Sequence, residues 1–492
     1  MAKYVLAIDQ GTTGTTCLVV DKRLAVRAKV SQEFRQIFPR SGWVEHDLED
    51  VWASVEQTVQ KALRQAGIKA KELAAIGITN QRETVGLWER HSGKALHPAI
   101  VWQCRRTADV CKALREEGRE GFVKERTGLV IDPYFSAAKL AWLLDHVKRA
   151  RERAERGELA AGTIDTFLTS RLTGGRAHVT DVSNASRTSL FNIRTLEWDP
   201  ELLALFRVPS AVLPAVKGSS EIYGSTEGLR VLPDGIPVAG MAGDQQAALF
   251  GQACFEIGEA KCTYGTGAFL LMNTGPQPVF SEHGLLTTVA WRLGGEVTYA
   301  LEGSAFIAGA AVQWLRDGLG LFRKAAQIEA LARTVKDSGE VVFVPALAGL
   351  GAPHWRPQAR GLVAGLTRDT TAGHLARATL EGIAFQVNDL AEAMRADAKA
   401  DIPAFKVDGG ACANDLLMQF QADLLGVKVV RPRMIETTAF GAAFLAGLST
   451  GVWQSRDAIR ETWKIGKSFA PRMKPEVRDA NLAKWRRAVA LA

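Results

Sequence analysis

The sequence Asp9-Gln10-Gly11-Thr12-Thr13-Gly14 lies between two apolar runs, residues 4–8 and 17–20. Aliphatic and β-branched side chains dominate both runs, so the pattern predicts two strands joined by a turn. Glycines let backbone N–H groups come close to a ligand, and N–H groups together with hydroxyls can cradle phosphate oxygens. The carboxylate of Asp9 can hold a hydrated Mg²⁺ beside those phosphates. A nucleotide-phosphate hairpin and an ordinary glycine-containing β-turn are both consistent with this hexapeptide.

The composition is that of a globular protein with more than one domain. The chain has 492 residues, of which 47% are hydrophobic and 23% charged, and domains have roughly 100–200 residues each. A net charge of +8 suits an anionic ligand such as a nucleotide and also raises the possibility of nucleic-acid binding. The densest basic run, residues 148–156, is interrupted by Glu152 and Glu155, which favours a solvated helix end over a nucleic-acid-binding stripe.

Cysteine usage and hydropathy predict a cytoplasmic protein. The cysteines, at positions 17, 104, 111, 254, 262 and 412, form neither a CxxC pair nor a metal-ligand spacing with histidine, which indicates reduced thiols. The first predicted strand begins almost at once, so no secretory signal is expected. No run of about 18 apolar residues occurs, so no membrane span is expected.

Polar residues follow three further predicted strands, at the points where those strands end. In open α/β sheets ligands bind at the carboxyl ends of strands, so these side chains are well placed for a site. For Arg82 and Glu83 the competing interpretation is a surface ion pair, and for Trp102 it is a tryptophan of the core. The strands are residues 73–79, 98–102 and 237–240, and the polar residues at their ends are Arg82, Glu83, Trp102 and Asp244.

The opening pattern recurs in weaker form in the second half. Tyr264-Gly265-Thr266-Gly267 joins two predicted strands, residues 259–263 and 268–272. A further glycine turn, residues 408–414, stands between a predicted strand and a helix that ends at Gly426. Two strand–turn–strand units so far apart predict two domains of like fold that face one nucleotide, with a boundary near Gly251.

Other stretches predict the elements between these turns. Residues 48–66 have the pattern of a helix closed by Gly67, and Ser136 is a possible N-cap of a later helix. Residues 162–172 and 181–191 are predicted to form an excursion at a sheet edge.

Taken together, residues 9–14, 265–267 and 408–414 resemble the turns of the actin/hexokinase/sugar-kinase superfamily. Two longer stretches are similar to the signatures of the FGGY carbohydrate kinases, namely residues 134–146 and residues 361–366 with 374–381. The resemblance extends over most of the chain and implies an α/β fold. It implies two actin/hexokinase-like (ribonuclease H-like) domains, residues 1–251 and 252–492, facing a central cleft.

Within that family the chain is most similar to the members that act on glycerol, through residues 9–13, 77–84, 101–106, 131–136 and 243–248. The resemblance implies ATP-dependent phosphorylation of glycerol to sn-glycerol 3-phosphate with Mg²⁺. By analogy with relatives it also implies a homodimer or homotetramer.

The resemblance also implies the role of each site residue. Asp244 matches the general base and, with Asp9, the metal side of the site. The residues matching the glycerol site are Arg82, Glu83, Trp102, Tyr134, Asp244, Gln245 and Phe269, of which Trp102 and Phe269 match apolar walls. Those matching the nucleotide site are Thr12, Thr13, Gly14, Thr266, Gly309, Gln313, Gly410 and Asn414.

The chemistry of these residue types supports the roles independently. A triol offers hydrogen-bond donors and acceptors without charge, so an arginine and a glutamate together can pair with both kinds. A carboxylate at hydrogen-bond distance can accept the proton of the attacking hydroxyl. Phosphoryl transfer otherwise needs alignment and charge stabilisation.

Two positions depart from the pattern of the family. Thr16 stands where many relatives have an arginine, so a cationic contact to the phosphates from that position is not expected. The short connection of residues 223–234 has Arg230 as its cation, and no histidine lies between His178 and His283. Neither a loop that binds a sugar bisphosphate nor a phosphorylatable histidine is therefore supported.

Three other functions compete with this prediction. Another FGGY kinase would act on a pentulose or a tetritol, which a panel of polyols and ketoses would reveal. A non-catalytic nucleotide switch would need no acceptor base, so Asp244 argues against it. A nucleic-acid binder is the weakest alternative because the basic residues are dispersed.

Overall fold

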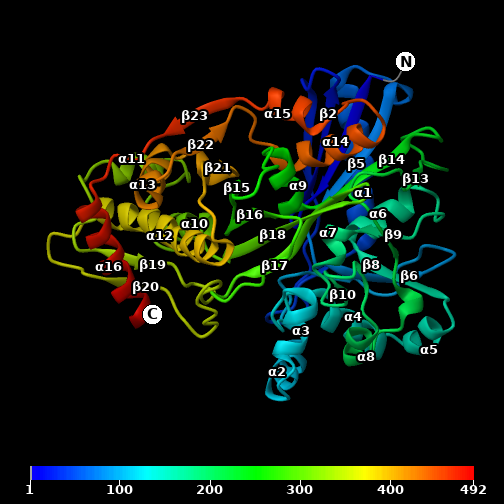
Figure 1. Cartoon of the computed structure of the whole chain (residues 1–492), viewed down its shortest axis with the longest axis horizontal. Helices are drawn as coiled ribbons and strands as arrows, with labels where there is room; N and C mark the ends of the chain where they lie inside the picture. Colours follow the sequence, from blue (N-terminus) through cyan, green and yellow to red (C-terminus); the bar gives the residue numbers. More distant parts are fainter. Residues whose placement is uncertain (1–2) are drawn as a thin grey trace.

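The computed structural model describes residues 3–492, and the chain forms two α/β units side by side (Figure 1). The first unit is built on a mixed sheet. Its strands, in spatial order, are β13 (Gly224–Ser225), β14 (Pro237–Gly243), β5 (Leu73–Asn80), β1 (Tyr4–Gln10), β2 (Gly14–Asp21) and β3 (Val26–Glu33). The second unit has a sheet with the spatial order β17 (Leu286–Leu293), β18 (Glu296–Ala305), β16 (Ala268–Gly275), β15 (Ala260–Tyr264), β21 (Phe405–Asp408), β22 (Val429–Pro432) and β23 (Ile465–Phe469).

The two sheets share one topology. In the first, β1 pairs with β2 and β2 with β3 in antiparallel fashion, while β1, β5 and β14 are parallel. In the second, β15 pairs with β16 and β16 with β18 in antiparallel fashion, while β15, β21 and β22 are parallel. The prediction of two like α/β units is confirmed.

Helices cover both sheets. Helix α1 (Leu48–Ala66) packs on β2 and β3 through its apolar face. Asp47 caps its N-terminus by accepting a hydrogen bond from the Glu49 amide, and Gly67 closes it with a left-handed φ of 66°. This helix has the predicted bounds. On the second sheet pack α12 (Ala372–Ala398) and α13 (Asp415–Leu425), and α12 in turn contacts α10 (Gly309–Asp317), α11 (Gln327–Ala332) and α16 (Pro475–Leu491).

One helix from the second half of the chain packs on the first sheet. Helix α14 (Thr437–Ser449) contacts β1, β5 and β14 and crosses α9 (Asp244–Gly251), and Figure 1 shows it in orange-red against the blue strands. Glycines allow this approach, because a Cβ on Gly441 would lie 1.9 Å from the Ala247 carbonyl oxygen. A Cβ on Gly251 would lie 2.0 Å from the Thr437 oxygen. The two halves are therefore joined by a close helix crossing.

Smaller elements extend the first unit at its edge. A further sheet has the order β4 (Glu45–His46), β7 (Ala99–Ile100), β6 (Val85–Glu89) and β8 (Leu159–Thr163). The short strands are β9 (Val179–Asp181), β10 (Phe191–Asn192), β11 (Glu197–Trp198) and β12 (Ala215–Lys217) here, and β19 (Val342–Val344) and β20 (Leu362–Ala364) in the second unit. The remaining helices are α2 (Ala108–Glu116), α3 (Glu120–Thr127), α4 (Ser136–His146), α5 (Ala150–Glu155), α6 (Ile164–Leu172), α7 (Val182–Ala185), α8 (Pro200–Phe206) and α15 (Arg456–Thr462).

Two local predictions were wrong. Residues 162–172 are mainly helix α6 rather than an edge excursion, and residues 181–191 begin with helix α7. Helix α6 is buried on nearly all sides, so its sequence lacks the apolar period that marks a surface helix. Ser136 is the first residue of α4, and the N-cap position is occupied by Phe135. The Ser136 hydroxyl instead donates to the Glu83 carbonyl oxygen at 3.1 Å.

Each of the six cysteine thiols lies buried and free of a disulfide within the described chain. Burial raises the pKa of Cys111, Cys254 and Cys412 to about 12. Among the helices of residues 3–492, none has the length and apolar character that a bilayer crossing requires.

Candidate active site

The predicted polar residues lie at one edge of the first sheet. Gln10 of β1 is in register with Asn80 of β5, and Asn80 with Gly243 of β14. Parallel strands bring their carboxyl ends to the same edge, so Arg82 and Asp244, which follow two of these strands, meet there. The Arg82 Nε atom lies 3.1 Å from Oδ1 of Asp244.

Asp244 has one carboxylate oxygen engaged and one available. Oδ1 accepts a hydrogen bond from the Gln245 amide at 2.7 Å and forms an ion pair with Arg82. Within residues 3–492 the partners of this carboxylate all contact Oδ1, so Oδ2 can accept a proton from a hydroxyl. The side chain is 31% exposed and opens α9, whose N-cap is Gly243. Asp244 therefore does not serve as the helix cap.

Arg82 is buried and held by several acceptors. Glu302 of β18 binds it in bidentate fashion, at 2.5 Å to Nη1 and 2.9 Å to Nη2. Nη1 also donates to Gln246 at 3.1 Å, and Nη2 has a longer contact of 3.5 Å with the Tyr134 hydroxyl. Because the Tyr134 contact is the longest, it is the contact that a ligand hydroxyl would most readily replace.

Glu83 is held in an unusual backbone conformation. Its φ of 60° is left-handed, which is costly for a residue other than glycine and is often found at functional sites. Arg187 donates from Nε to Glu83 Oε1 at 2.7 Å. The hydrogen bond to this carboxylate within residues 3–492 is on Oε1, so Oε2 is the oxygen that can accept from a ligand hydroxyl.

Sequence reasoning did not identify Arg187 and Glu302. Both are fully buried, and Arg187 Nη2 lies 3.0 Å from Glu302 Oε1. Burial disfavours the ionised form of Glu302, but the guanidinium groups of Arg187 and Arg82 outweigh it and lower the pKa to about 2. A glutamate between the apolar residues Leu301 and Ala300 on one side and the buried end of β18 on the other was the signal that could have revealed this residue.

Aromatic side chains stand beside the polar cluster. The rings of Trp102 and Tyr134 meet edge to face with centroids 5.6 Å apart. Trp102 Nε1 also donates to Thr12 Oγ1 at 2.9 Å, which connects this ring to the β1–β2 turn. Phe269 of β16 lies on the same sheet face as Glu302, because Leu271 pairs with Glu302 and side chains alternate along a strand.

The orientation of Gln245 is fixed by a buried lysine. Lys261 Nζ donates to Gln245 Oε1 and to Thr263 Oγ1. An ammonium can only donate, so the amide oxygen must face Lys261 and the Gln245 Nε2 group remains to donate elsewhere.

The two glycine turns have the same hydrogen bond. The Gly11 amide donates to the Gly14 carbonyl at 2.9 Å, and the Gly265 amide donates to the Gly267 carbonyl at 2.8 Å. Helix α10 begins directly on the second turn, where the Gly309 amide donates to Gly265 at 3.0 Å. Equivalent turns thus occur at the equivalent edge of each sheet.

A cavity of about 430 Å³ adjoins the second turn. Apolar side chains such as Val312, Ile328 and Leu417 line it and could contact a flat ring. Asn414 also caps α13, since its side chain accepts from the Leu417 amide at 2.9 Å. The cavity brings together the predicted nucleotide residues of this half, which are Thr266, Gly309, Gln313, Gly410 and Asn414.

The acidic residues near the first turn fit a divalent cation. Burial is the largest cause that raises the pKa of Asp9 to about 7, and the nearby carboxylates of Asp244 and Glu436 raise it further. A cation would relieve this repulsion. Within residues 3–492 there is no cluster of three or more acidic, His or Cys side chains, but Mg²⁺ is usually held by one or two carboxylates together with phosphates.

Thr16 does not face the turn as a free hydroxyl. It is hydrogen-bonded to Ser31 at 2.8 Å on the neighbouring strand β3. Lys29, two residues from Ser31 and on the same face, pairs with Glu436 ahead of α14. A lysine on β3 therefore brings a positive charge to the face of the sheet that carries Thr16.

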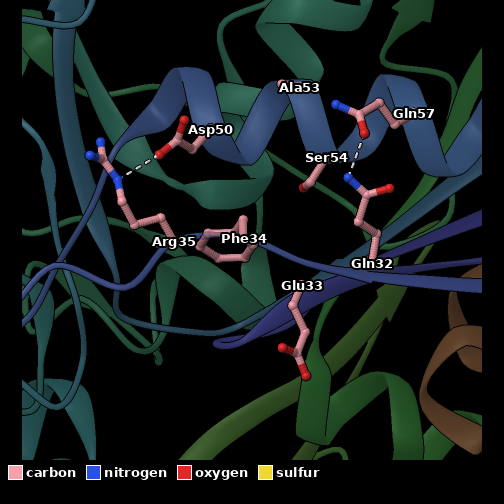
Figure 2. A pocket seen from close by; sticks show the side chains of 8 residues that line it. All are labelled: Gln32, Glu33, Phe34, Arg35, Asp50, Ala53, Ser54 and Gln57. Carbon is pink, nitrogen blue, oxygen red and sulfur yellow. Dashed lines mark hydrogen bonds and ion pairs between the residues drawn. The ribbon is translucent and has the colours of Figure 1, made fainter.

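A second hollow, of about 410 Å³, lies between β3 and α1 (Figure 2). Its side chains satisfy one another, since Gln32 binds Gln57 and Arg35 binds Asp50, while Glu33 points away. One lining residue contacts the β1–β2 turn, since the Phe34 amide donates to the Thr13 carbonyl oxygen at 3.3 Å. The hollow does not include the converging polar residues.

The repeated sheets, the paired glycine turns and the polar cluster between them are the features of a sugar kinase. Comparison with known families agrees: the N-terminal domain of the FGGY family of carbohydrate kinases matches residues 4–251, and its C-terminal domain matches residues 260–450. The chain belongs to the FGGY family of carbohydrate kinases.

The similar relatives are glycerol kinases. The chain is 66% identical to the glycerol kinase of Myxococcus xanthus and 54% identical to that of Bdellovibrio bacteriovorus, over 99% of each chain. The crystal structure of Plasmodium falciparum glycerol kinase with ADP superposes with a TM-score of 0.93 at 35% identity, covering 99% of this chain and 98% of that one.

Proposed function

We propose that this chain phosphorylates glycerol with ATP to give sn-glycerol 3-phosphate, a step of glycerol catabolism. The observation that carries the proposal is the available Oδ2 of Asp244 beside the buried Arg82–Glu83 pair, in a chain so similar to glycerol kinases. The triol is uncharged. Arg82 and Glu83 can donate to and accept from its hydroxyls, and their charges are already balanced by Glu302 and Arg187.

Arg82, Glu83, Tyr134 and Gln245 are proposed to bind the hydroxyls. Glu83 accepts through Oε2, while Arg82 Nη2 and Gln245 Nε2 donate. Trp102 and Phe269 form the apolar walls around the three carbons. A longer ketose would have to displace one of these walls, and the site therefore selects a short polyol.

Asp244 is proposed as the general base. Oδ2 accepts the proton of the attacking hydroxyl as its oxygen bonds to the phosphoryl group, and Arg82 keeps Oδ1 oriented. Asp9 and Asp244 are the carboxylates that would hold Mg²⁺. When bound, the ion supplies positive charge at the phosphates.

The nucleotide residues are divided between the halves. Thr12, Thr13 and Gly14 offer hydroxyls and amides to phosphate oxygens from the first turn, and Thr266 offers them from the second. Gly309, Gln313, Gly410 and Asn414 surround the cavity proposed for the adenosine.

Residues 1–251 and 252–492 are proposed to act as two domains that close over the ligands and exclude water, a competing acceptor. Small-angle scattering with glycerol and a non-hydrolysable ATP analogue should show a more compact particle than without them. A cytoplasmic homodimer or homotetramer is part of the same proposal, and buried reduced thiols support that location.

A coupled ADP-release assay across glycerol, dihydroxyacetone, erythritol and xylulose tests the function. Glycerol should give the highest kcat/KM of the four. A higher value for xylulose or erythritol would assign the chain to another FGGY kinase. ADP release that does not depend on any of these acceptors would instead support a nucleotide switch.

A further inference from the structure

Two charged residues without an assigned role complete the buried cluster around the polyol site. Arg187, from the segment after α7, and Glu302, from the middle of β18, are both 0% exposed. Arg187 binds Glu83 at 2.7 Å and Glu302 at 3.0 Å, and Glu302 binds Arg82 at 2.5 Å. Arg82 Nε lies 3.8 Å from Glu83 Oε1 and closes the ring.

Each contact of this ring restricts a group that is proposed to bind the triol. Glu302 uses both oxygens on Arg82, which fixes the plane of that guanidinium. Arg187 donates to Oε1 of Glu83 and restricts this carboxylate, while no hydrogen bond within residues 3–492 involves Oε2. The two guanidinium and two carboxylate charges balance, so the buried cluster needs no counter-ion.

The ring also crosses between the two halves of the chain. Glu302 belongs to the second sheet, whereas Arg82, Glu83 and Arg187 belong to the first half. The geometry of Arg82 is therefore complete only when β18 lies against the first half. Phe269, on the same sheet face as Glu302, also belongs to the second half.

We propose that Arg187 and Glu302 are positioning residues for the polyol, which hold Arg82 and Glu83 in the geometry that binds its hydroxyls. This inference rests on the proposed function. Neither residue contacts the nucleotide cavity, so their effect is specific to the acceptor substrate.

The test measures steady-state kinetics of Glu302→Gln and Arg187→Met with glycerol and ATP varied in turn. The glycerol KM should rise at least about tenfold, since loss of one partner leaves a buried charge unpaired and Arg82 or Glu83 misaligned. The ATP KM should change less than about twofold, because neither residue contacts the nucleotide cavity. A general loss of structure would instead raise the KM of both substrates.

Glu259→Gln is the matched control. Glu259 is a half-buried glutamate paired with Lys406 at 3.2 Å, at the end of β15 remote from the glycine turn. It should lower the melting temperature without a selective change in the glycerol KM. If Glu302→Gln behaves like this control, Glu302 is a structural ion-pair partner and the inference fails.

Conservative and double variants keep the test decisive. Where Arg187→Met or Glu302→Gln does not fold, Arg187→Lys and Glu302→Asp retain the charge but displace it, and their glycerol KM should still rise more than their ATP KM; an equal change in both would overturn the inference. The double variant Arg187→Met/Glu302→Gln should be no worse than the poorer single variant, because members of one cluster are not additive. Additive losses would show two independent residues and overturn the inference.

The outcome also separates this inference from the proposed function. A wild-type chain that phosphorylates glycerol, with folded variants of unchanged glycerol KM, overturns the inference alone. A wild-type chain that does not phosphorylate glycerol overturns both. Protection of the chain from thermal unfolding by glycerol without ATP gives a binding readout, and the variants should lose that protection.

Discussion

The carboxylate of Asp244 is oriented, as the proposed proton transfer requires. Its Oδ1 atom is held by Arg82 and by the Gln245 amide, so rotation of the carboxylate is restricted. An asparagine would keep the oxygen contact to Arg82 but could not accept a proton through its amide nitrogen. The chemistry of one atom, Oδ2, therefore distinguishes the native enzyme from this variant.

Asp244→Asn should lower kcat by about 10²–10⁴, the usual contribution of a general base. Glycerol binding should weaken much less, because Arg82, Glu83 and Tyr134 remain. Initial rates at saturating substrates would measure the loss, and the melting temperature would control for folding. Retention of more than about a tenth of the wild-type kcat would contradict the assignment.

Trp102 should show two separable effects. Trp102→Ala removes the wall and should raise the glycerol KM far more than the ATP KM. Trp102→Phe keeps a ring but loses the hydrogen bond to Thr12, so the ATP KM should rise roughly two- to tenfold, the range for one neutral hydrogen bond. Equal changes for both substrates in both variants would mean that Trp102 is a core residue.

At the level of elements, the crossing of α9 and α14 depends on the absence of two side chains. Gly441→Ala would place a Cβ 1.9 Å from the Ala247 oxygen, so the helices would have to separate. We expect a loss of about 1–3 kcal/mol in the free energy of unfolding. Denaturant unfolding measures it.

Gly121→Ala is the control for the glycine prediction. Gly121 lies in α3 with nothing within 4 Å of an added Cβ. Alanine there should stabilise the chain by about 0.5–1 kcal/mol, since it favours the helix. Equal effects of the two substitutions would show that the crossing tolerates a methyl group.

The elements that could be predicted from sequence are those with local signals. The two glycine hairpins and helix α1 follow from runs, turns and caps that are contiguous in the chain. The contacts of Arg187 and Glu302 could not be found in this way, because they span more than a hundred residues. Helix α6 was missed because burial on every side removes the apolar period.

The nucleotide and glycerol residues were placed by resemblance rather than by periodicity. Their side chains come from turns, from the first residues of helices such as α9 and α10, and from strand β16, and no repeating pattern identifies them. The structure collects five of them around one cavity and several others at one sheet edge. Their roles in binding remain predictions for the experiments above.

For the whole molecule, two buried histidines should make stability depend on pH. Burial lowers the pKa of His46 and of His178 from 6.5 to about 4. Between these values each of these histidines binds a proton more readily in the unfolded chain than in the folded chain, so their contribution to stability is full above pH 6.5 and falls as the pH decreases toward 4. Each histidine could contribute roughly 3 kcal/mol to this change.

Denaturant unfolding between pH 7 and 4.5 would test the histidine prediction. His178→Gln keeps a donor for the Ala161 carbonyl and should make the pH dependence shallower. The exposed His91→Gln is the control and should leave the slope unchanged. An unaltered slope in His178→Gln would show that this ring is not responsible.

The burial of every cysteine has a practical consequence for observing motion. The thiolate is the form that reacts with labelling reagents, and all six native thiols are buried within the described chain. Cysteines introduced at Lys112 on α2 and Arg486 on α16, both exposed, would therefore react far faster than the native ones. A donor and an acceptor dye on this pair would report the distance between the halves in solution. Energy transfer that rises when glycerol and a nucleotide analogue are added would time the closure directly, with no native cysteine replaced.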